Sequence, residues 1–236
     1  MKNIIFIFSL SFLFISCDIT GNHTAGNGKV VTETRKVADF HSIKSSGSID
    51  IEISPSESFS VEVQNDENLL EYVVTEVKNG VLEVRYKSGT YLNDHAKVFI
   101  SAPGLNEISS SGSADIAING TLKNSGEISF HLSGSGDVEG SVDAPSVKAY
   151  SSGSGDIKLS GRTKDFLCEI RGSGDVKCEG LRSENADVSV MGSADVHVFA
   201  SVGLKVTVSG SGDVYYSGKP QNPEIKIRGS GSVKSQ

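Results

Sequence analysis

The fold is decided by a four-residue word, GSGD, which recurs as SGSGD at residues 133–137, 152–156 and 209–213. Close variants are SGSID at 46–50, SGSAD at 111–115, RGSGD at 171–175 and MGSAD at 191–195. Aligned on their first glycine, eight copies fall at Gly47, Gly112, Gly134, Gly153, Gly172, Gly192, Gly210 and Gly229. After a long first gap the steps are 22, 19, 19, 20, 18 and 19 residues. A regular period near 20 is typical of a solenoid.

The segments around each copy alternate between apolar and other residues. Before Gly172, for example, every second residue is apolar at Phe166, Cys168 and Ile170, and Val176 follows the word. A period of two predicts a strand with one buried face. Each repeat is therefore expected to be a strand, a corner, a second strand and a variable connection that often contains glycine.

Two architectures fit this pattern, a parallel β-helix and an antiparallel meander with the word at its hairpin tips. Recurrence of the same serine favours the β-helix, because stacked corner serines can hydrogen-bond to one another. Seven coils would form a rod roughly 30 Å long. Glycine at the first position indicates a positive φ or no room for a β-carbon. We therefore assign a structural corner role to Gly112, Ser113, Gly134, Ser135, Gly153, Ser154, Gly172, Ser173, Gly192, Ser193, Gly210 and Ser211.

The start of the chain predicts export and lipid anchoring. Residues 1–16 combine Lys2 with a short apolar run, which is typical of a signal peptide and too short to span a membrane. The following ISC resembles a bacterial lipobox and makes Cys17 the predicted lipidation site; an ordinary cleavage near Ser16 is the alternative. Residues 17–28 are expected to be anchor and flexible tether.

The rest of the chain, residues 29–236, is predicted to be one domain, with the regular array at 106–235. Residues 29–105 are interpreted as wider first coils whose longer loops cap one end of the core. The segment DENLLEYV indicates a short helical turn, capped by Asn65 or Asp66.

Several blocks in order resemble a known family. These blocks are ADFHSIKSSGSIDIEIS, FSVEVQNDENLL, VTEVKNGVLEVRY and VFISAPGLNEISSSGSADI, followed by the serial GSGD strands. Residues 36–235 are thereby similar to the auto-transporter adhesin, head GIN domain family, common among exported proteins and lipoproteins of Bacteroidetes-type bacteria. The resemblance implies an all-β fold, a right-handed parallel β-helix shaped like pectin lyases, without a recognised active site. It also implies an adhesive role. The chain departs from the pattern at Ile49 and Ser232.

Aspartates fill the fourth position of the word and form a candidate cation site. The column comprises Asp115, Asp137, Asp156, Asp175, Asp195 and Asp213. Carboxylates stacked about 4.8 Å apart would repel by about 0.9 kcal/mol in water and about 3.5 kcal/mol at an effective dielectric of 20. Hydrogen bonds from the backbone of each aspartate's own corner would offset this repulsion. Calcium bound between coils is the alternative, and otherwise no cofactor or metal is expected.

Other chemistry-bearing residues do not assemble into a site. The histidines (His23, His41, His95, His131, His197) lack ligand spacing and are expected at the surface. Cys168 and Cys178 fall on apolar columns, which favours buried free thiols over a disulfide bond. Outward Lys158, Lys177 and Arg171 are expected to be solvated strand charges. The tyrosines Tyr150 and Tyr215 are weak candidates for contact with a sugar or protein partner.

These observations lead to one functional expectation. A net charge of −7 argues against nucleic acid as a partner. The chain also lacks the paired carboxylates of a glycan-cleaving enzyme, so no enzyme is expected. The expected function is a non-catalytic binding or adhesion module, lipid-anchored to the cell envelope at the outer membrane. Its expected partner is a glycan or a cell-surface protein, and oligomerisation is left open. A structural or envelope-sensing role is the alternative, ahead of a glycan-active enzyme.

Overall fold

The structure is a computed structural model and describes residues 23–236. Cys17 and the predicted signal peptide lie outside the described residues. Within them, no helix is both long enough and apolar enough to cross a membrane.

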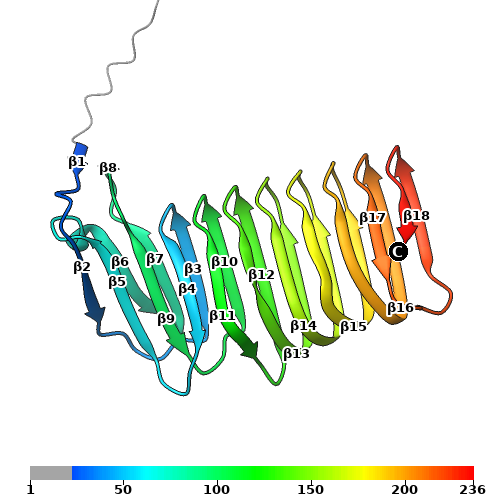
Figure 1. Ribbon diagram of the computed structural model, residues 1–236, viewed down its shortest axis with the longest axis horizontal. Coiled ribbons are helices and arrows are strands. Elements are labelled where there is room, and N and C mark those ends of the chain that lie inside the picture. The colour runs from blue at the N-terminus through cyan, green and yellow to red at the C-terminus, as the bar shows by residue number, and fades with distance from the viewer. Residues whose placement is uncertain (1–22) are drawn as a thin grey trace, which may run out of the picture.

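The chain forms a parallel β-solenoid, and this confirms the predicted fold class. Its most regular part consists of four long strands, each paired in parallel with the next: β13 (Val138–Ser151), β14 (Ile157–Ile170), β15 (Val176–Val190) and β16 (Val196–Gly210). The corner words join consecutive strands along the upper edge of Figure 1, and the strands themselves bend through the lower edge. The variable connections predicted at Gly161 and Gly180 are therefore hydrogen-bonded parts of β14 and β15 rather than free loops.

Each coil contributes to two faces of the solenoid. Face A contains the strands that lead into the corner glycines: β3 (Ser42–Gly47), β10 (Glu107–Gly112), β12 (Glu127–Gly134), the second halves of β13 to β16, and β18 (Glu224–Gly229). Face B contains the strands that leave the corners: β4 (Asp50–Pro55), β11 (Ile116–Lys123), the first halves of β13 to β16, β17 (Val214–Ser217) and β19 (Val233–Ser235). Apolar side chains from both faces fill the interior, and Phe130 is completely buried there.

The first coil, β3 and β4, is not stacked in chain order. It lies between strands of residues 81–102 on one side and β10 and β11 on the other. Figure 1 shows this as blue strands inserted between green ones. The long first gap of the repeat therefore contains strands that stack on the other side of this coil.

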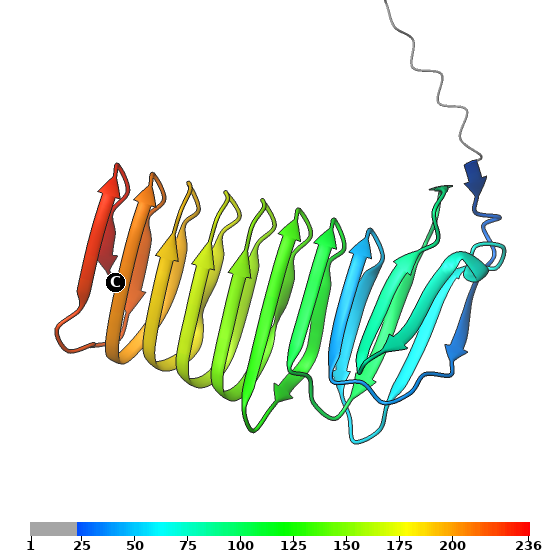
Figure 2. The same ribbon diagram turned by 180° about the vertical axis from the view of Figure 1, so that it is seen from behind.

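Antiparallel strands cover the N-terminal end of the solenoid, as Figure 2 shows from behind. β5 (Ser60–Asp66) pairs with both β2 (Val30–Arg35) and β9 (Lys97–Ala102), and β6 (Val73–Lys78) pairs with β7 (Val81–Tyr86). This agrees with the expectation that residues 29–105 cap one end of the core. The capping elements are antiparallel strands rather than wider coils, because they pair back on the first coils instead of continuing the stack.

The helical turn is present but its predicted cap is wrong. A 3-10 helix, η1, spans Leu70–Tyr72, and Leu69 precedes it without a side-chain cap. Asn65 and Asp66 are fully buried instead, and their side chains hold a polar cluster described below.

Candidate binding surfaces

The corner aspartates form a hydrogen-bonded ladder along the upper edge. The Oδ1 atom of each aspartate accepts the backbone N–H of the fourth residue in the next coil, at 2.8 to 3.1 Å. The ladder begins at Asp50 and ends where Ser232 donates to Asp213. The expected hydrogen bond within each aspartate's own corner is therefore replaced by one between coils, because the neighbouring corner places its N–H beside the carboxylate.

A backbone-to-backbone hydrogen bond also joins adjacent corners along this edge, and here the earlier coil donates to the later one. The carbonyl of Asp156, for example, accepts the N–H of Val138 from the preceding coil at 2.9 Å. Each aspartate thus joins adjacent coils through both its side chain and its main chain. These contacts offset the repulsion between neighbouring carboxylates, because each charge faces a fixed N–H dipole.

Lysines add to the ladder at two places. Lys177 Nζ lies 2.8 Å from Asp156 Oδ2, and Lys234 Nζ lies 3.1 Å from Asp213 Oδ2. The hydrogen bond from Ser232 and the one from Lys234 lower the pKa of Asp213 to about 2. No group of three or more His, Cys, Asp or Glu side chains within residues 23–236 is arranged to hold a metal ion.

The corner serines do not form the expected serine-to-serine hydrogen bonds in the described part of the chain. Their side chains are exposed, and their backbone N–H groups bond to the glycine carbonyl of the preceding coil, as from Ser135 to Gly112 at 2.8 Å. The inter-coil bonds at the corner therefore come from the main chain and from the aspartates. The structure places the corner glycines and serines at the turns, where each glycine packs against the backbone of its neighbour.

The two cysteines of the array are free and buried. Burial raises the pKa of Cys178 to about 12, and burial also raises the pKa of Cys168 well above its usual range. Neither thiol ionises near neutral pH, so both act as small apolar side chains.

Each candidate tyrosine has one ring face covered by a histidine of the preceding coil. Tyr150 stacks on His131 and Tyr215 stacks on His197, each with ring centroids 4.7 Å apart. Lys234 lies 5.2 Å from the centre of the Tyr215 ring. Because these partners cover ring faces within the ladder of coils, a sugar ring cannot lie flat on the covered faces. The basic residues flagged in the sequence form ion pairs, Lys158 with Glu139 at 2.7 Å and Arg171 with Glu169 at 3.7 Å.

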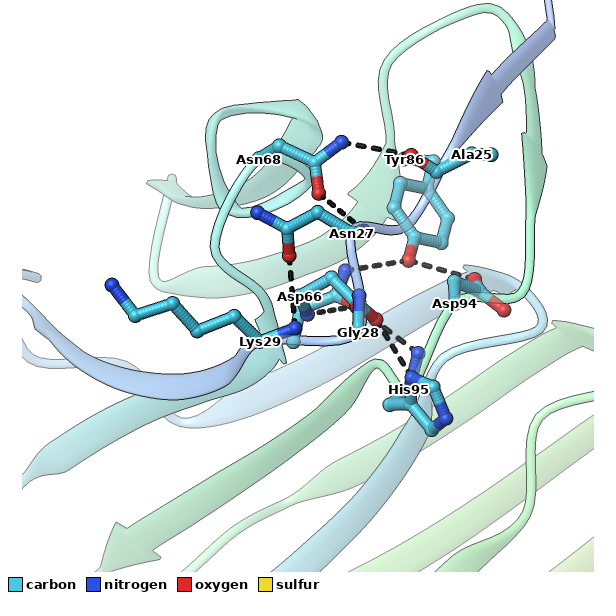
Figure 3. Close-up of polar contacts among 10 residues, drawn as sticks. Ala25, Asn27, Gly28, Lys29, Asp66, Asn68, Tyr86, Asp94 and His95 are labelled. Atoms are coloured by element: carbon cyan, nitrogen blue, oxygen red, sulfur yellow. Dashed lines mark hydrogen bonds and ion pairs between the residues drawn. The ribbon is translucent and has the colours of Figure 1, made fainter.

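A buried polar cluster fastens residues 23–29 to the capped end (Figure 3). The Asp66 carboxylate accepts the Gly28 N–H and lies 2.7 Å from His95 Nδ1. These hydrogen bonds, that of His95 foremost, lower the pKa of Asp66. Beside them Asn65 donates to the Tyr86 hydroxyl, which donates to Asp94.

The same cluster revises the predicted tether. β1 (His23–Ala25) pairs in parallel with β8 (Thr90–Leu92), and the Asn68 side chain bonds to both Ala25 and Asn27. Residues 23–28 are thus hydrogen-bonded to the domain, whereas the tether was expected to continue through residue 28.

A candidate site that the sequence did not reveal is a groove on face A beside the lower edge, which we call the lower groove. It has a volume of about 530 Å³ and crosses β13 to β16 and the start of β18. Two rows of outward side chains line it, Ser146–Asp165–Asn185–Gly203 and Lys148–Leu167–Asp187–Lys205–Glu224, with Gln221 and Asn222 at one end. Phe166, Ala186 and Leu204 lie between the rows but point into the core and are at most 4% exposed, so Leu167 is the apolar side chain of the lining that faces outward.

The end wall of the lower groove is a short loop held in place. Pro220 and Pro223 flank Gln221 and Asn222, and the Gln221 N–H bonds to the Val202 carbonyl at 2.8 Å. Prolines fix φ on both sides of the two amide residues. Within the groove Asn185 donates to Asp165 at 2.8 Å, and Lys205 lies 2.7 Å from Asp187. The groove is therefore preformed.

The fold and these surfaces define a rigid β-solenoid with polar grooves. Residues 39–220 match the family described as "Putative auto-transporter adhesin, head GIN domain", and the chain belongs to this family. No curated protein matched the chain.

Solved structures of three bacterial proteins share the fold. One from Bacteroides fragilis, described as a putative adhesin, has a TM-score of 0.87 at 24% identity and covers 90% of this chain and 100% of its own. Another putative adhesin, from Parabacteroides distasonis, has a TM-score of 0.77 at 26% identity, with 91% and 100% covered. A third, from the same species and described as a putative lipid binding protein, has a TM-score of 0.73 at 26% identity, with 91% and 99% covered.

Proposed function

We propose that this protein is an exported lipoprotein that acts as a non-catalytic adhesion module, and that its lower groove binds a neutral glycan of the partner surface. Membership of an adhesin family supports the general role. The composition of the lower groove is the observation that carries the choice of ligand.

A sugar offers hydroxyls that both donate and accept hydrogen bonds, and an apolar C–H face. The lower groove supplies carboxylates from Asp165 and Asp187, amides from Asn185 and Gln221, and one outward apolar side chain, Leu167. Fixed polar groups beside apolar surface are the usual composition of a small-molecule site.

Charge favours a neutral glycan over an acidic one. Lys148 and Lys205 contribute two positive charges to the lining, against three negative charges from Asp165, Asp187 and Glu224. Lys205 is already paired with Asp187. An acidic sugar would therefore enter a groove without surplus positive charge, in a chain whose net charge is −7.

The binding test uses the chain from residue 18, which keeps every residue that the structure describes. We expect it to bind a subset of neutral glycans on an array. Asn185→Ala and Gln221→Ala should each weaken that binding by about tenfold, equivalent to about 1.4 kcal/mol. The matched control is Lys158→Ala on face B, an exposed ion-pair residue that should change neither binding nor melting temperature.

Each outcome of this test has a distinct meaning. Absence of glycan binding would contradict the glycan assignment and would favour a structural role. Binding that is insensitive to both groove variants would contradict the site. Phospholipid vesicles form a second arm, because one neighbour is described as a lipid binding protein; binding of vesicles in place of glycans would also contradict the proposal.

The anchor has its own test. Support for it comes from the apolar run of residues 1–16 and from the ISC that ends at Cys17. We expect the full chain to fractionate with outer membranes and to incorporate labelled fatty acid. Cys17→Ser should abolish labelling and remove the protein from the outer-membrane fraction, since stable anchoring by lipid needs more than one acyl chain. Labelling of the Cys17→Ser variant would contradict lipidation at this residue.

A further inference from the structure

We propose that two copies of this chain join through the open C-terminal end of the solenoid, each strand β18 and β19 pairing antiparallel with its equivalent in the second copy. The two ends of the molecule differ. Antiparallel strands cover the N-terminal end, whereas β18 pairs only with β16, and β19 only with β17, within the described residues. Figures 1 and 2 show these last strands at the red end with no element beyond them.

The open end exposes side chains that belong to inward columns. Ile225 and Ile227 are 41% and 44% exposed, although their register partners Val206 and Val208 in the previous coil are fully buried. Together with two unpaired strand edges, they form a surface that another strand pair can continue.

The sequence of β18 is complementary to itself when it pairs antiparallel about Lys226. In that register Ile225 faces Ile227 of the second copy, and Glu224 faces Arg228 of the second copy. Apolar side chains thus meet on the inward side, and two opposite-charge pairs form on the outward side. Cross-strand pairs of these kinds stabilise antiparallel sheets.

A second copy also matches the geometry of the whole end. β18 and β19 lie on different faces, and they cross the long axis of the solenoid in opposite directions. A two-fold axis perpendicular to the faces reverses both strands at once, so it pairs β18 with β18 and β19 with β19. This contact is isologous and uses the open edges of both β18 and β19, so no third copy can add at the C-terminal end. Lys226 lies opposite Lys226 of the second copy, and the repulsion between these two like charges weakens the contact. We therefore expect the dimer to dissociate on dilution.

The dimer would place both lower grooves on the same side, because the two-fold axis keeps face A of each copy facing the same way. Residues 23–28 of each copy would lie at a far end. Two grooves on one surface would engage a repeated ligand with higher avidity than either alone. The dimer contact does not depend on what the lower groove binds.

Charge reversal tests the register. We expect the chain from residue 18 to sediment as a dimer that dissociates on dilution. Glu224→Arg places Arg against Arg, and Arg228→Glu places Glu against Glu, so each variant alone should be monomeric. An equimolar mixture of the two variants should restore the dimer, because every pair is then opposite in charge. A wild-type monomer at all concentrations, or variants that dimerise like the wild type, would overturn the proposal.

An apolar variant tests the inward side. Ile225→Asp should yield a monomer with an unchanged circular dichroism spectrum, because the side chain is already largely exposed in the single copy. Val202→Asp is the matched control, since Val202 is an exposed apolar residue outside both terminal strands, and it should remain dimeric. A dimeric Ile225→Asp variant, or equal dissociation of both variants, would overturn the assigned contact.

Discussion

Gly172 lies at a corner where a β-carbon would overlap the carbonyl oxygen of Gly153 in the preceding coil. Its φ is outside the left-handed region, so the requirement is one of space. Gly47 is the reverse case: its φ is +106°, and open space surrounds the position of a β-carbon. Glycine in this column is therefore required for two different physical reasons. At Gly172 the preceding coil leaves no room for a β-carbon, and at Gly47 the backbone conformation disfavours other residues.

We expect Gly172→Ala to lower the free energy of unfolding by about 1–3 kcal/mol, because the added methyl forces adjacent corners apart. Gly126→Ala is the control: the nearest atom to its β-carbon would be Asn124 Oδ1 at 3.5 Å, an ordinary contact. Urea unfolding of the two variants gives the comparison. Equal stability of the two variants would contradict this prediction, because it would mean that the stacked corners can accommodate a β-carbon.

Asp213 makes stability depend on pH in a defined window. Its pKa of about 2 in the folded state is below the ordinary aspartate value of about 3.9. The folded state therefore favours the charged form; the resulting stability is complete above about pH 4 and is lost as the pH falls toward 2. Asp213→Asn keeps an acceptor for the Ser232 N–H but cannot titrate. Urea unfolding between pH 2 and 5 should show a shallower slope for Asp213→Asn than for the wild type. Parallel slopes would contradict the assignment.

Along the upper edge, the aspartate ladder is an element in its own right. Each Oδ1 is occupied by a backbone N–H, and some Oδ2 atoms are paired with lysines. We expect no difference in melting temperature between chelator and millimolar calcium, measured by differential scanning fluorimetry. A rise with calcium that Asp156→Asn and Asp175→Asn diminish would instead establish cation binding between coils.

The buried Asp66 links β1 and residues 26–29 to the capped end. Asp66→Ala removes the acceptor for Gly28 and the partner of His95. We expect trypsin to cleave after Lys29 several-fold faster in this variant, because the segment then opens more often. Glu57→Ala, at an exposed loop position, serves as the control. Unchanged cleavage in both variants would mean that β1 and its other hydrogen bonds suffice to hold the segment.

How far an element can be predicted depends on where its partner lies in the sequence. The strands flanking Gly153, Gly172 and Gly192 were predictable because each coil stacks on the next copy of the same pattern, about 19 residues away. One partner of Ser42–Gly47 was not, since Val81–Tyr86 carries no corner word that would reveal the pairing.

The candidate sites follow the same rule. Asp66 was interpreted as a helix cap because its true partners, Gly28 and His95, are 38 and 29 residues away. The lower groove depends on which residues align across the bends. The register shifts there, between Cys178 and Arg182 for example, so repeat spacing alone does not place Asn185 beside Gly203.

On the scale of the whole molecule, the regular array and the first coil differ in how their contacts form. Neighbouring long strands are close in sequence, whereas β3 and β10 pair across 65 residues. Closing longer loops costs more chain entropy and slows folding. In pulse-labelled hydrogen exchange during refolding, we therefore expect amides of β14 and β15 to gain protection before those of β3 and β4. Simultaneous protection, or earlier protection of the first coil, would contradict this order.

The displaced first coil also bears on how the chain is made. Synthesis delivers residues 42–55 early, yet both strand pairs that flank them, within residues 81–102 and 107–123, come later. A chain cut short before those residues has nothing on which this coil can stack. The first coil therefore cannot complete its strand pairing until more than half of the chain has been synthesised. That delay suits the proposed export, because translocation requires a chain that has not yet folded.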